Sequence, residues 1–215
     1  MEVAAAVAER LALAARNGGH IALTGGTTPE LAYKEATRRE PDWSDVEIWW
    51  SDERCVPPDD DLSNYALAKR TLLDLLERGP RAVHRIRGEL GKEKAAADYE
   101  LELGDTAFDL ELLGIGKDGH AASLFPNAPT LRETNRVLPA EPGLEPFVDR
   151  VTLSIPALNS AREIVFAVAG SEKAEAVRRA FASPAGPETP ASLIRALNGR
   201  TTAILDRTAA AKLRA

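Results

Sequence analysis

The sequence predicts an α/β fold, with a mainly parallel sheet that carries helices on both faces. Short apolar segments with strand character alternate along the chain with longer segments of helical character, which is the pattern of strand–helix–strand units. The chain has 215 residues and is 44% hydrophobic, so it can bury one sizeable core. We therefore expect a single domain that spans residues 1–215.

The first half of the chain is expected to contain four helices and two strands. The opening stretch sets Glu2, Glu9 and Arg10 among alanines, which favours an amphipathic helix over a secretory signal. The apolar runs HIAL (20–23) and VEIWW (46–50) are typical of buried strands. The remaining three expected helices are ELAYKEATRR (30–39), the leucine-rich segment 67–76 terminated by Gly79, and ELGKEKAAADYELEL (89–103).

The second half is expected to contribute most of the sheet. Strands are predicted at residues 108–113, 150–155, 163–170 and 201–205, with a helix at 172–182. The polar, proline-rich stretch 127–146 is expected to be irregular, and SPAGPETPAS (183–192) is expected to be a surface loop.

Composition excludes several kinds of partner. A net charge of −6 argues against a nucleic-acid or anionic-membrane partner, because both need an extended basic surface. No run of about 18 apolar residues occurs, so no membrane span is predicted. Cys55 is the single cysteine, which fits a reducing compartment. We expect a cytoplasmic protein that binds neither nucleic acid nor membrane.

Four segments that follow expected strands contain residues suited to binding or catalysis. They are residues 24–29, 51–54, 114–120 and 171–173. In parallel α/β sheets, ligands bind beyond the carboxyl ends of the strands, so these segments are the candidate site.

The segment TGGTTP combines two glycines with the start of a helix. Pro29 is expected at the first helical position and Thr28 at the N-cap. The backbone amides of Gly25, Gly26 and Thr27 would then point outward at the positive end of a helix dipole, which suits a phosphate or a carboxylate. The lysine of a Walker P-loop is missing, so a nucleoside triphosphate is not indicated. An ordinary tight turn is the alternative.

The segment SDER places Asp52 and Arg54 directly after a strand. Asp52 is suited to hold sugar hydroxyls, and the Arg54 guanidinium is suited to face an anion or a developing oxyanion. The alternative is that these charges are simply solvated. Cys55 follows without an adjacent base, which argues against a cysteine nucleophile.

The segment GIGKDGH brings an acid and an imidazole together in a glycine-rich turn. Its glycines formally match a dinucleotide-binding motif, but Pro126 interrupts the long helix that such a motif should open. Asp118 can orient His120 or raise its basicity, and imidazole titrates close to neutral pH, so His120 is the candidate general base. A purely structural histidine is the alternative.

Two further basic residues occur at element boundaries. Arg150 opens an expected strand and Lys173 opens an expected helix, and each alone is explained by solvation. The planar guanidinium of Arg150, the ammonium group of Lys173 and the backbone N–H donors of TGGTTP are together suited to hold one phosphate.

With these motifs, the chain resembles the superfamily of 6-phosphogluconolactonases and glucosamine-6-phosphate isomerases. The matching blocks occur in order over nearly the whole chain: TGGTTP, SDERCVP with SNYALAK, GIGKDGHAASLFP, RVTLSIPALN and GSEKAEAV. The isomerase branch is similar to DGHIAFNEP, with a glutamate before the proline, whereas this sequence has Phe125 there. A phenyl ring cannot take part in the acid–base steps of ring opening and deamination, so the lactonase branch is favoured.

The resemblance implies a modified Rossmann-like fold without a dinucleotide, and hydrolysis of 6-phosphoglucono-δ-lactone to 6-phosphogluconate in the oxidative pentose phosphate pathway. We expect catalytic roles for His120, Asp118 and Arg54. The expected substrate and phosphate site comprises Gly25, Gly26, Thr27, Thr28, Asp52, Asn64, Arg150 and Lys173. No cofactor and no metal is expected, and the expected partner is a small sugar-phosphate lactone, bound by a monomer.

Three other functions remain open. An isomerase would convert glucosamine 6-phosphate, a sugar-phosphate-binding regulator would bind without turnover, and a dehydrogenase would bind a nicotinamide cofactor. The superfamily usually has a strand before its first helix, whereas this sequence starts inside the helix. Either that edge strand is missing or the start site is misassigned.

Overall fold

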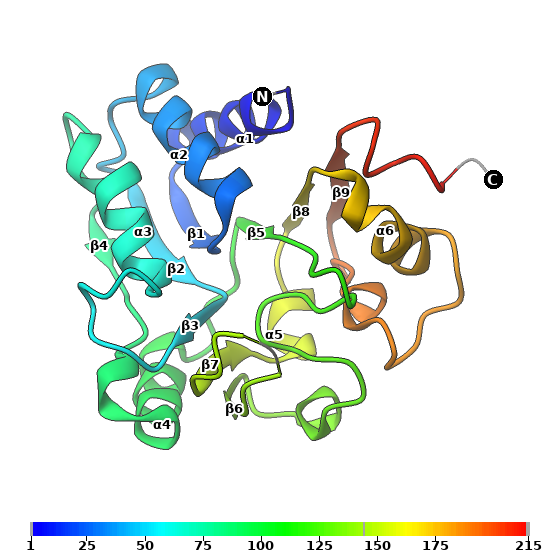
Figure 1. Cartoon of the computed structure of the whole chain (residues 1–215). Coiled ribbons are helices and arrows are strands. Elements are labelled where there is room, and N and C mark those ends of the chain that lie inside the picture. The colour runs from blue at the N-terminus through cyan, green and yellow to red at the C-terminus, as the bar shows by residue number, and fades with distance from the viewer. Residues whose placement is uncertain (1, 144, 214–215) are drawn as a thin grey trace.

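The main sheet consists of strands that all pair in parallel (Figure 1). The protein is described by a computed structural model over residues 2–143 and 145–213. The strand order is β4 (Ala82–Val83), β2 (Val46–Trp50), β1 (Gly19–Leu23), β5 (Leu110–Leu113), β8 (Glu163–Val168) and β9 (Arg200–Leu205). The four central strands, β2, β1, β5 and β8, are mostly apolar and buried because both faces of the sheet are covered there. The predicted α/β class with a mainly parallel sheet is confirmed.

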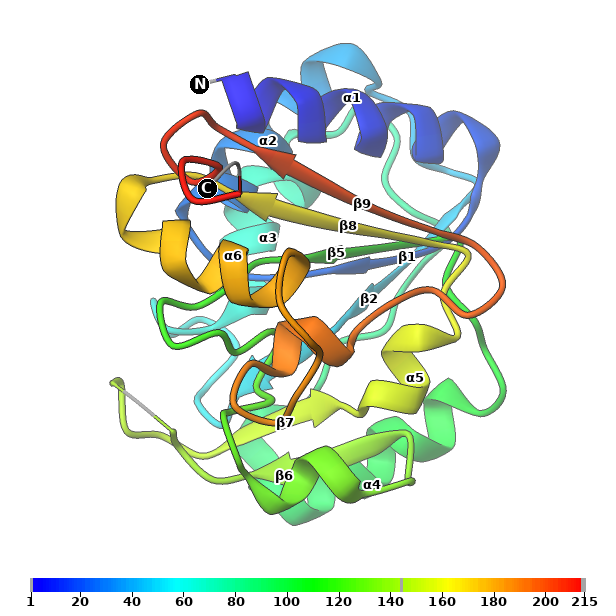
Figure 2. The same cartoon turned by 90° about the vertical axis from the view of Figure 1, so that its right-hand side faces the viewer.

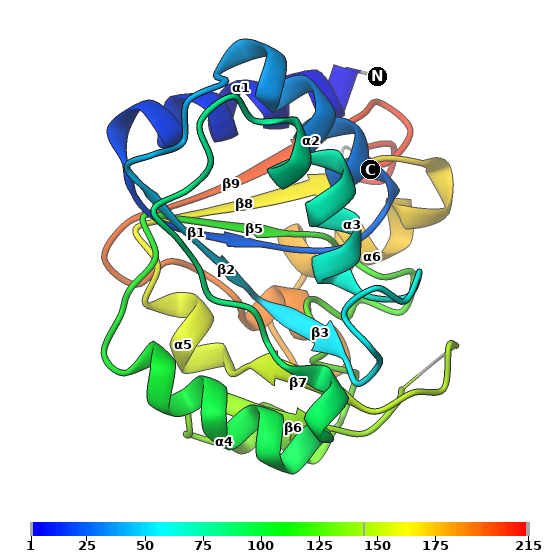
Figure 3. The same ribbon diagram turned by 90° about the vertical axis from the view of Figure 1, so that its left-hand side faces the viewer.

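Helices and a second sheet cover the two faces (Figures 2 and 3). One face carries α1 (Glu2–Asn17) and α2 (Thr27–Arg39), which pack against each other. The opposite face carries α5 (Ile155–Asn159) and a layer formed by the second sheet and α4 (Lys92–Leu103). Two short helices lie near the carboxyl ends of the main strands: α3 (Asn64–Thr71) and α6 (Ala174–Phe181).

The second sheet is antiparallel, and the sequence pattern does not predict it. In it, β3 (Asp52–Arg54) pairs with β7 (Arg150–Leu153), which pairs with β6 (Val137–Ala140). The polar SDER segment is therefore mostly a strand, and part of the stretch expected to be irregular is another. The remaining strand of this sheet, β7, ends at Leu153 and not at residue 155 as predicted. It ends there because Ser154 caps α5, and its Oγ accepts a hydrogen bond from the Ala157 N–H.

The start of α2 differs from the predicted one. The helix begins at Thr27 with Gly26 at the N-cap, so Thr28 is the second helical residue and the prediction of Thr28 as the cap is wrong. Pro29 is consequently the third helical residue. It is tolerated there because the first N–H groups of a helix have no intrahelical acceptor.

Two other helix boundaries also differ. The predicted leucine-rich helix ends at Thr71, because Leu72 leaves helical geometry at φ −130° and ψ −69°, and the prediction that Gly79 terminates it is wrong. Helix α4 begins at Lys92, after Gly91 adopts φ 82°, a conformation that favours glycine.

The core is a continuous cluster of apolar side chains between the sheet and its covering layers. Its largest fully buried members are Trp43, Trp50, Tyr33, Tyr99, Phe108 and Phe166. The two tyrosine hydroxyls bond to backbone groups of Thr24 and Trp50, at the carboxyl ends of β1 and β2. The covering helices therefore fix the strand ends from which the candidate site is built.

Glu111 is an acidic residue inside this core. It belongs to β5 and is 0% exposed, and its carboxylate oxygens have no hydrogen-bond partner among the residues that the structure describes. Burial raises the pKa of Glu111 well above its ordinary value, and the negative charge of Asp52 adds to the rise. The folded chain therefore favours the protonated form of Glu111.

Replacing Glu111 by Met is expected to stabilise the fold most strongly at alkaline pH. Since the pKa is higher in the folded than in the unfolded chain, wild-type stability falls as the pH rises from the unfolded pKa towards the folded one. Glu111→Met removes this loss together with two unpaired oxygens. Its free energy of unfolding should exceed that of wild type by about 1–3 kcal/mol at pH 8 and by less at pH 5, measured by urea unfolding.

Glu111→Gln is the matched control, because it keeps the shape and the polar atoms but cannot ionise. Glu111→Gln should make the free energy of unfolding less dependent on pH. It should not reach the full stability of Glu111→Met, because its polar atoms remain buried without partners. A Met variant less stable than wild type at pH 8 would contradict this account of Glu111.

Candidate active site

A cavity of about 420 Å³ opens at the carboxyl ends of the main strands. Segments that follow β1, β2, β5 and β8 line it, together with parts of α3 and β7. The residues predicted from the sequence that line it are Gly25, Gly26, Thr27, Thr28, Asp52, Arg54, Asn64, His120, Arg150 and Lys173. Asp118 takes part through its contact with His120. The fold thus brings the predicted residues together around one space.

The N-terminus of α2 presents backbone donors to this cavity. Helical hydrogen bonding starts with the Glu30 N–H, which donates to the Gly26 carbonyl (3.0 Å). The N–H groups of Thr27 and Thr28 precede it, at the positive end of the helix dipole. Gly26 enters the helix at φ 110°, which favours glycine. This arrangement suits an anionic ligand.

Asp52 and Asn64 form a buried polar pair in the cavity wall. Asn64 Nδ2 donates to the backbone oxygen (2.9 Å) and to Oδ1 (3.1 Å) of Asp52, and the Ser123 hydroxyl donates to Oδ2 (2.6 Å). Gly25 leaves room for this pair, because a Cβ at Gly25 would lie 2.0 Å from Asn64 Oδ1. Asp52 is 5% exposed, so the alternative of a solvated charge is wrong for this residue.

Glu53, the neighbour of Asp52, has a structural role. Its carboxylate accepts hydrogen bonds from the N–H groups of Arg54, Asn64 and Tyr65 and from the Ser63 hydroxyl. Burial raises the pKa of Glu53, although these hydrogen bonds oppose the rise. The bonds join β3 to the first turn of α3, which is how Asn64 is carried into the cavity.

The turn after β5 holds Asp118 and His120 in contact. Asp118 Oδ1 accepts a hydrogen bond from the His120 backbone N–H (3.1 Å) and lies 2.6 Å from His120 Nδ1. Because an ionised carboxylate only accepts, Nδ1 carries the proton and Nε2 keeps its lone pair. Burial raises the pKa of Asp118, but the hydrogen bonds from His120, together with the positive charge that the ring carries when it is protonated, outweigh burial and hold that pKa below its ordinary value.

Glycines allow the backbone of this turn to close around the imidazole. The Gly119 N–H donates to the Gly116 carbonyl (3.0 Å), the Gly116 N–H donates to the His120 carbonyl (2.9 Å), and Gly119 adopts φ 98°. A Cβ on Gly116 would lie 2.0 Å from His120 Nδ1. The position of Gly116 is therefore explained by the histidine that packs on it.

Residues 183–192, expected to be a surface loop, partly support this turn. Thr189 and Ala191 are buried, and the Ala191 N–H donates to the Gly119 carbonyl (3.0 Å). Thr189 packs directly against Gly119, where a Cβ would lie 2.9 Å from Thr189 Cγ2. The prediction is wrong for the second half of this segment, because these residues pack on the turn.

Arg54 and Arg150 lie side by side on β3 and β7, where they are register partners. Burial lowers the pKa of Arg150, and the positive charge of Arg54 lowers it further. Arg54 Nε is buried without a hydrogen-bond partner among residues 2–143 and 145–213. Arg150 donates from Nε to the Val148 carbonyl (3.3 Å) and from Nη2 to the Pro146 carbonyl (3.2 Å). Two adjacent guanidinium groups favour an anion between them.

Lys173 lines the cavity beside Lys117 and Glu172, two residues of the candidate segments to which sequence analysis gave no role. Burial lowers the pKa of Lys173, Glu172 opposes this effect, and Lys117 adds to it. Lys117 belongs to the GIGKDGH motif and was therefore visible in the sequence. Its proximity to Lys173 depends on the pairing of β5 with β8, which the motif alone does not reveal.

Cys55 is not suited to nucleophilic chemistry. It is half-buried, and burial together with the negative charges of Asp149 and Glu53 raises its pKa to about 11. The nucleophile is the thiolate, so a thiol with this pKa is unreactive near neutral pH. In the part of the chain that the structure describes, no group of three or more His, Cys, Asp and Glu side chains is arranged to hold a metal ion. Within the same residues, the helices are too short or too polar to cross a membrane.

The fold is that of a Rossmann-like α/β protein, and its cavity is lined by cationic side chains, the backbone donors of a helix N-terminus and a histidine in contact with a carboxylate. A family model described as glucosamine-6-phosphate isomerases/6-phosphogluconolactonase matches residues 1–203. The chain belongs to this family, as its motifs indicate.

Individual relatives agree with the family match. The chain is 37% identical over 214 residues to a 6-phosphogluconolactonase of Synechocystis, which covers 94% of this chain and 88% of the relative. The solved structure of the 6-phosphogluconolactonase from Trypanosoma brucei has a TM-score of 0.88 at 27% identity, over 99% of this chain and 95% of that one. A monomeric glucosamine-6-phosphate deaminase has a TM-score of 0.84 at 23% identity, over 98% and 95% of the two chains, and establishes a common fold alone.

Glu53→Gln is expected to destabilise the fold by about 1–3 kcal/mol, because a carboxamide turns one acceptor of a buried network into a donor that faces other donors. Urea unfolding measures the change. Glu172→Gln, at an exposed glutamate of the cavity rim, is the control and should stay within about 0.5 kcal/mol of wild type. Equal stabilities of the two variants would show that the Glu53 network does not hold β3 to α3.

Proposed function

We propose that this chain hydrolyses 6-phosphoglucono-δ-lactone to 6-phosphogluconate, a step of the oxidative pentose phosphate pathway. The observation that carries the proposal is the imidazole of His120, oriented by Asp118 at 2.6 Å in the wall of a cavity that is also lined by Arg54, Arg150 and Lys173. Relatives named 6-phosphogluconolactonase, matched over most of the chain, support it.

In this proposal His120 transfers one proton twice. His120 Nε2 takes a proton from water as the water oxygen attacks C1 of the lactone, which forms a tetrahedral intermediate with a negative oxygen. The intermediate then collapses, the bond between C1 and the ring oxygen breaks, and the proton passes from Nε2 to that oxygen. Asp118 keeps Nδ1 protonated and stabilises the imidazolium that exists between the two transfers.

The cations of the cavity are proposed to have two roles, stabilising the reaction intermediate and binding the phosphate. Arg54 is proposed to stabilise the negative oxygen of the intermediate, a type of interaction whose loss typically costs about 3 kcal/mol of transition-state free energy. Arg150, Lys173 and the amides at the start of α2 are proposed to hold the 6-phosphate. Binding energy far from C1 then positions the ester for attack. Asp52 and Asn64 are proposed to contact the sugar hydroxyls.

We also propose that the protein acts as a single-domain cytoplasmic monomer. A continuous apolar core joins the two sheets, which supports a single domain. The single cysteine and the net charge of −6 support a reducing compartment without a nucleic-acid or membrane partner.

The isomerase reaction is the alternative within the family, and Phe125 argues against it. The Phe125 ring lies 5.2 Å from the His120 ring, centroid to centroid, at the position where the isomerase motif has a glutamate. Ring opening and deamination need a second proton-transfer group there, and a phenyl ring cannot supply one. Release of ammonia from glucosamine 6-phosphate by the purified protein would reverse this assignment.

Replacing His120 by Asn is expected to remove most of the catalysis. General acid–base groups contribute on the order of 10²–10⁴-fold, so kcat should fall by at least about 100-fold while the fold is kept. Acid release from 6-phosphogluconolactone, generated in place and corrected for the uncatalysed rate, measures it. His84→Asn changes a histidine outside the cavity and should keep wild-type kcat. Near-normal turnover by a folded His120→Asn protein would exclude His120 as the base.

Lys173→Met is expected to weaken recognition of the phosphate. A hydrogen bond to a charged group contributes about 1.5–3 kcal/mol, so KM for the phosphorylated lactone should rise by roughly 10–100-fold. Turnover of unphosphorylated glucono-δ-lactone should change little. Lys212→Met, at an exposed lysine paired with Glu175, is the control and should leave both substrates unaffected. If Lys173→Met impairs both lactones equally, Lys173 does not bind the phosphate.

A further inference from the structure

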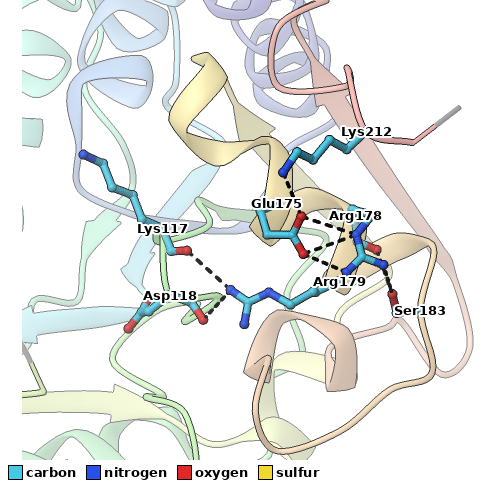
Figure 4. Close-up of polar contacts among 7 residues, drawn as sticks. All are labelled: Lys117, Asp118, Glu175, Arg178, Arg179, Ser183 and Lys212. Atoms are coloured by element: carbon cyan, nitrogen blue, oxygen red, sulfur yellow. Dashed lines mark hydrogen bonds and ion pairs between the residues drawn. The ribbon is translucent and has the colours of Figure 1, made fainter. Parts of the chain in front are cut away.

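We infer that Arg179 of α6 is a positioning residue that holds the turn carrying Asp118 and His120. The inference rests on the proposed function, in which His120 is the base. Figure 4 shows the Arg179 guanidinium extending from α6 to this turn, where Nη2 donates to the backbone carbonyls of Asp118 (3.0 Å) and Lys117 (3.4 Å).

The preceding residue on the same helix, Arg178, belongs to a separate network. Arg178 Nη2 lies 2.7 Å from Glu175 Oε1, Lys212 Nζ lies 3.1 Å from the other oxygen of Glu175, and Arg178 Nη1 donates to Ser183 Oγ (3.1 Å). The two consecutive arginines therefore bind different parts of the protein. Arg178 fastens the exposed side of α6 to nearby segments, and Arg179 reaches the catalytic turn.

The partly buried guanidinium of Arg179 is not fully satisfied by hydrogen bonds. Its side chain makes no ion pair within the described part of the chain, and its Nε is buried there without a partner. Partial burial of a guanidinium in exchange for hydrogen bonds to two carbonyls is costly for stability. The geometry that Arg179 imposes on the turn explains its placement better than a stabilising role does.

The carbonyls that Arg179 binds belong to the peptide units on either side of the Asp118 side chain. The Asp118 carbonyl precedes Gly119, whose φ of 98° and hydrogen bond to Gly116 close the turn. The Gly119 carbonyl is in turn held by the Ala191 N–H. With Arg179 and Ala191 as fixed points, the Asp118 carboxylate stays at Nδ1 of His120, and Nε2 remains available as the base.

The anchor also lies on the helix that follows the proposed phosphate ligand. Helix α6 begins one residue after Lys173 and carries Arg179 in its second turn. The group that meets the phosphate and the group that sets the base are therefore joined by a few helical residues.

Arg179→Met is the test, with Arg178→Met as the matched control on the adjacent position. Arg179→Met keeps the apolar stem but removes the donors. We expect its kcat to fall by about 10–100-fold, the scale of a misplaced catalytic group, while KM stays within about threefold of wild type. Arg178→Met should leave kcat and KM within about twofold of wild type, because its network does not touch the turn.

A second readout does not depend on turnover. The ring ¹⁵N chemical shifts of His120 report which nitrogen carries the proton. We expect the Nδ1–H form in wild type and in Arg178→Met, and a mixture with the Nε2–H form in Arg179→Met, because the Asp118 carboxylate is no longer held against Nδ1.

The outcomes separate the inference from the proposed function. If wild type does not hydrolyse the lactone but the ring shifts change in Arg179→Met alone, the proposed function fails and the positioning role stands. If folded Arg179→Met keeps wild-type kcat or wild-type ring shifts, the inference is wrong. Should Arg179→Met not fold, Arg179→Gln, which is too short to reach the turn, carries the same expectations.

Discussion

The parallel pairing of the main strands is the constraint on which the site depends. Because β1, β2, β5 and β8 run in one direction, the segments after them emerge at one edge of the sheet and line a common cavity. The small sheet adds what the main sheet cannot supply. After Ser51 the chain turns out of the main sheet into β3, and its pairing with β7 sets Arg54 opposite Arg150. Asp118, His120 and Lys173 thus follow strands of the main sheet, whereas Arg54 and Arg150 belong to the small sheet.

Charged groups in and around the cavity differ in how their charge is compensated. Those that are fully hydrogen-bonded within the protein hold the structure together, and those that are desolvated without full compensation are suited to bind a ligand. Glu53 is buried but fully engaged with backbone donors, so it holds β3 to α3. Burial lowers the pKa values of Arg150 and Lys173, because their cationic groups lose hydration in the free protein. An anionic ligand offsets that penalty when it binds. Under the proposed function, the same desolvation would strengthen the response of these two cations to the 6-phosphate.

Local sequence patterns predicted much of this fold, and the elements that depend on contacts between distant parts of the chain were not predicted. The strands β1 and β2 and the motif residues follow from short apolar runs and glycine-rich turns. By contrast, β6 contains Pro139, which reads as a strand breaker and is accommodated because β6 lies at the edge of the small sheet. The buried half of residues 183–192 and the bond from Arg179 to the turn depend on tertiary contacts that leave no periodic trace in the sequence.

Phe125 shows how one position can separate two reactions on this fold. Its ring packs against His120, lies 6.0 Å from the Arg150 guanidinium carbon, and approaches Gly143 so closely that a Cβ there would lie 2.3 Å from the ring. A carboxylate at this position would be a second proton-transfer group beside the imidazole and would be attracted to Arg150. Isomerisation needs protons moved at two centres, whereas the proposed hydrolysis passes one proton out and back through His120. An apolar ring at this position therefore supplies no second proton-transfer group beside the imidazole, which agrees with the proposed hydrolysis of a lactone and argues against the deamination of an amino sugar.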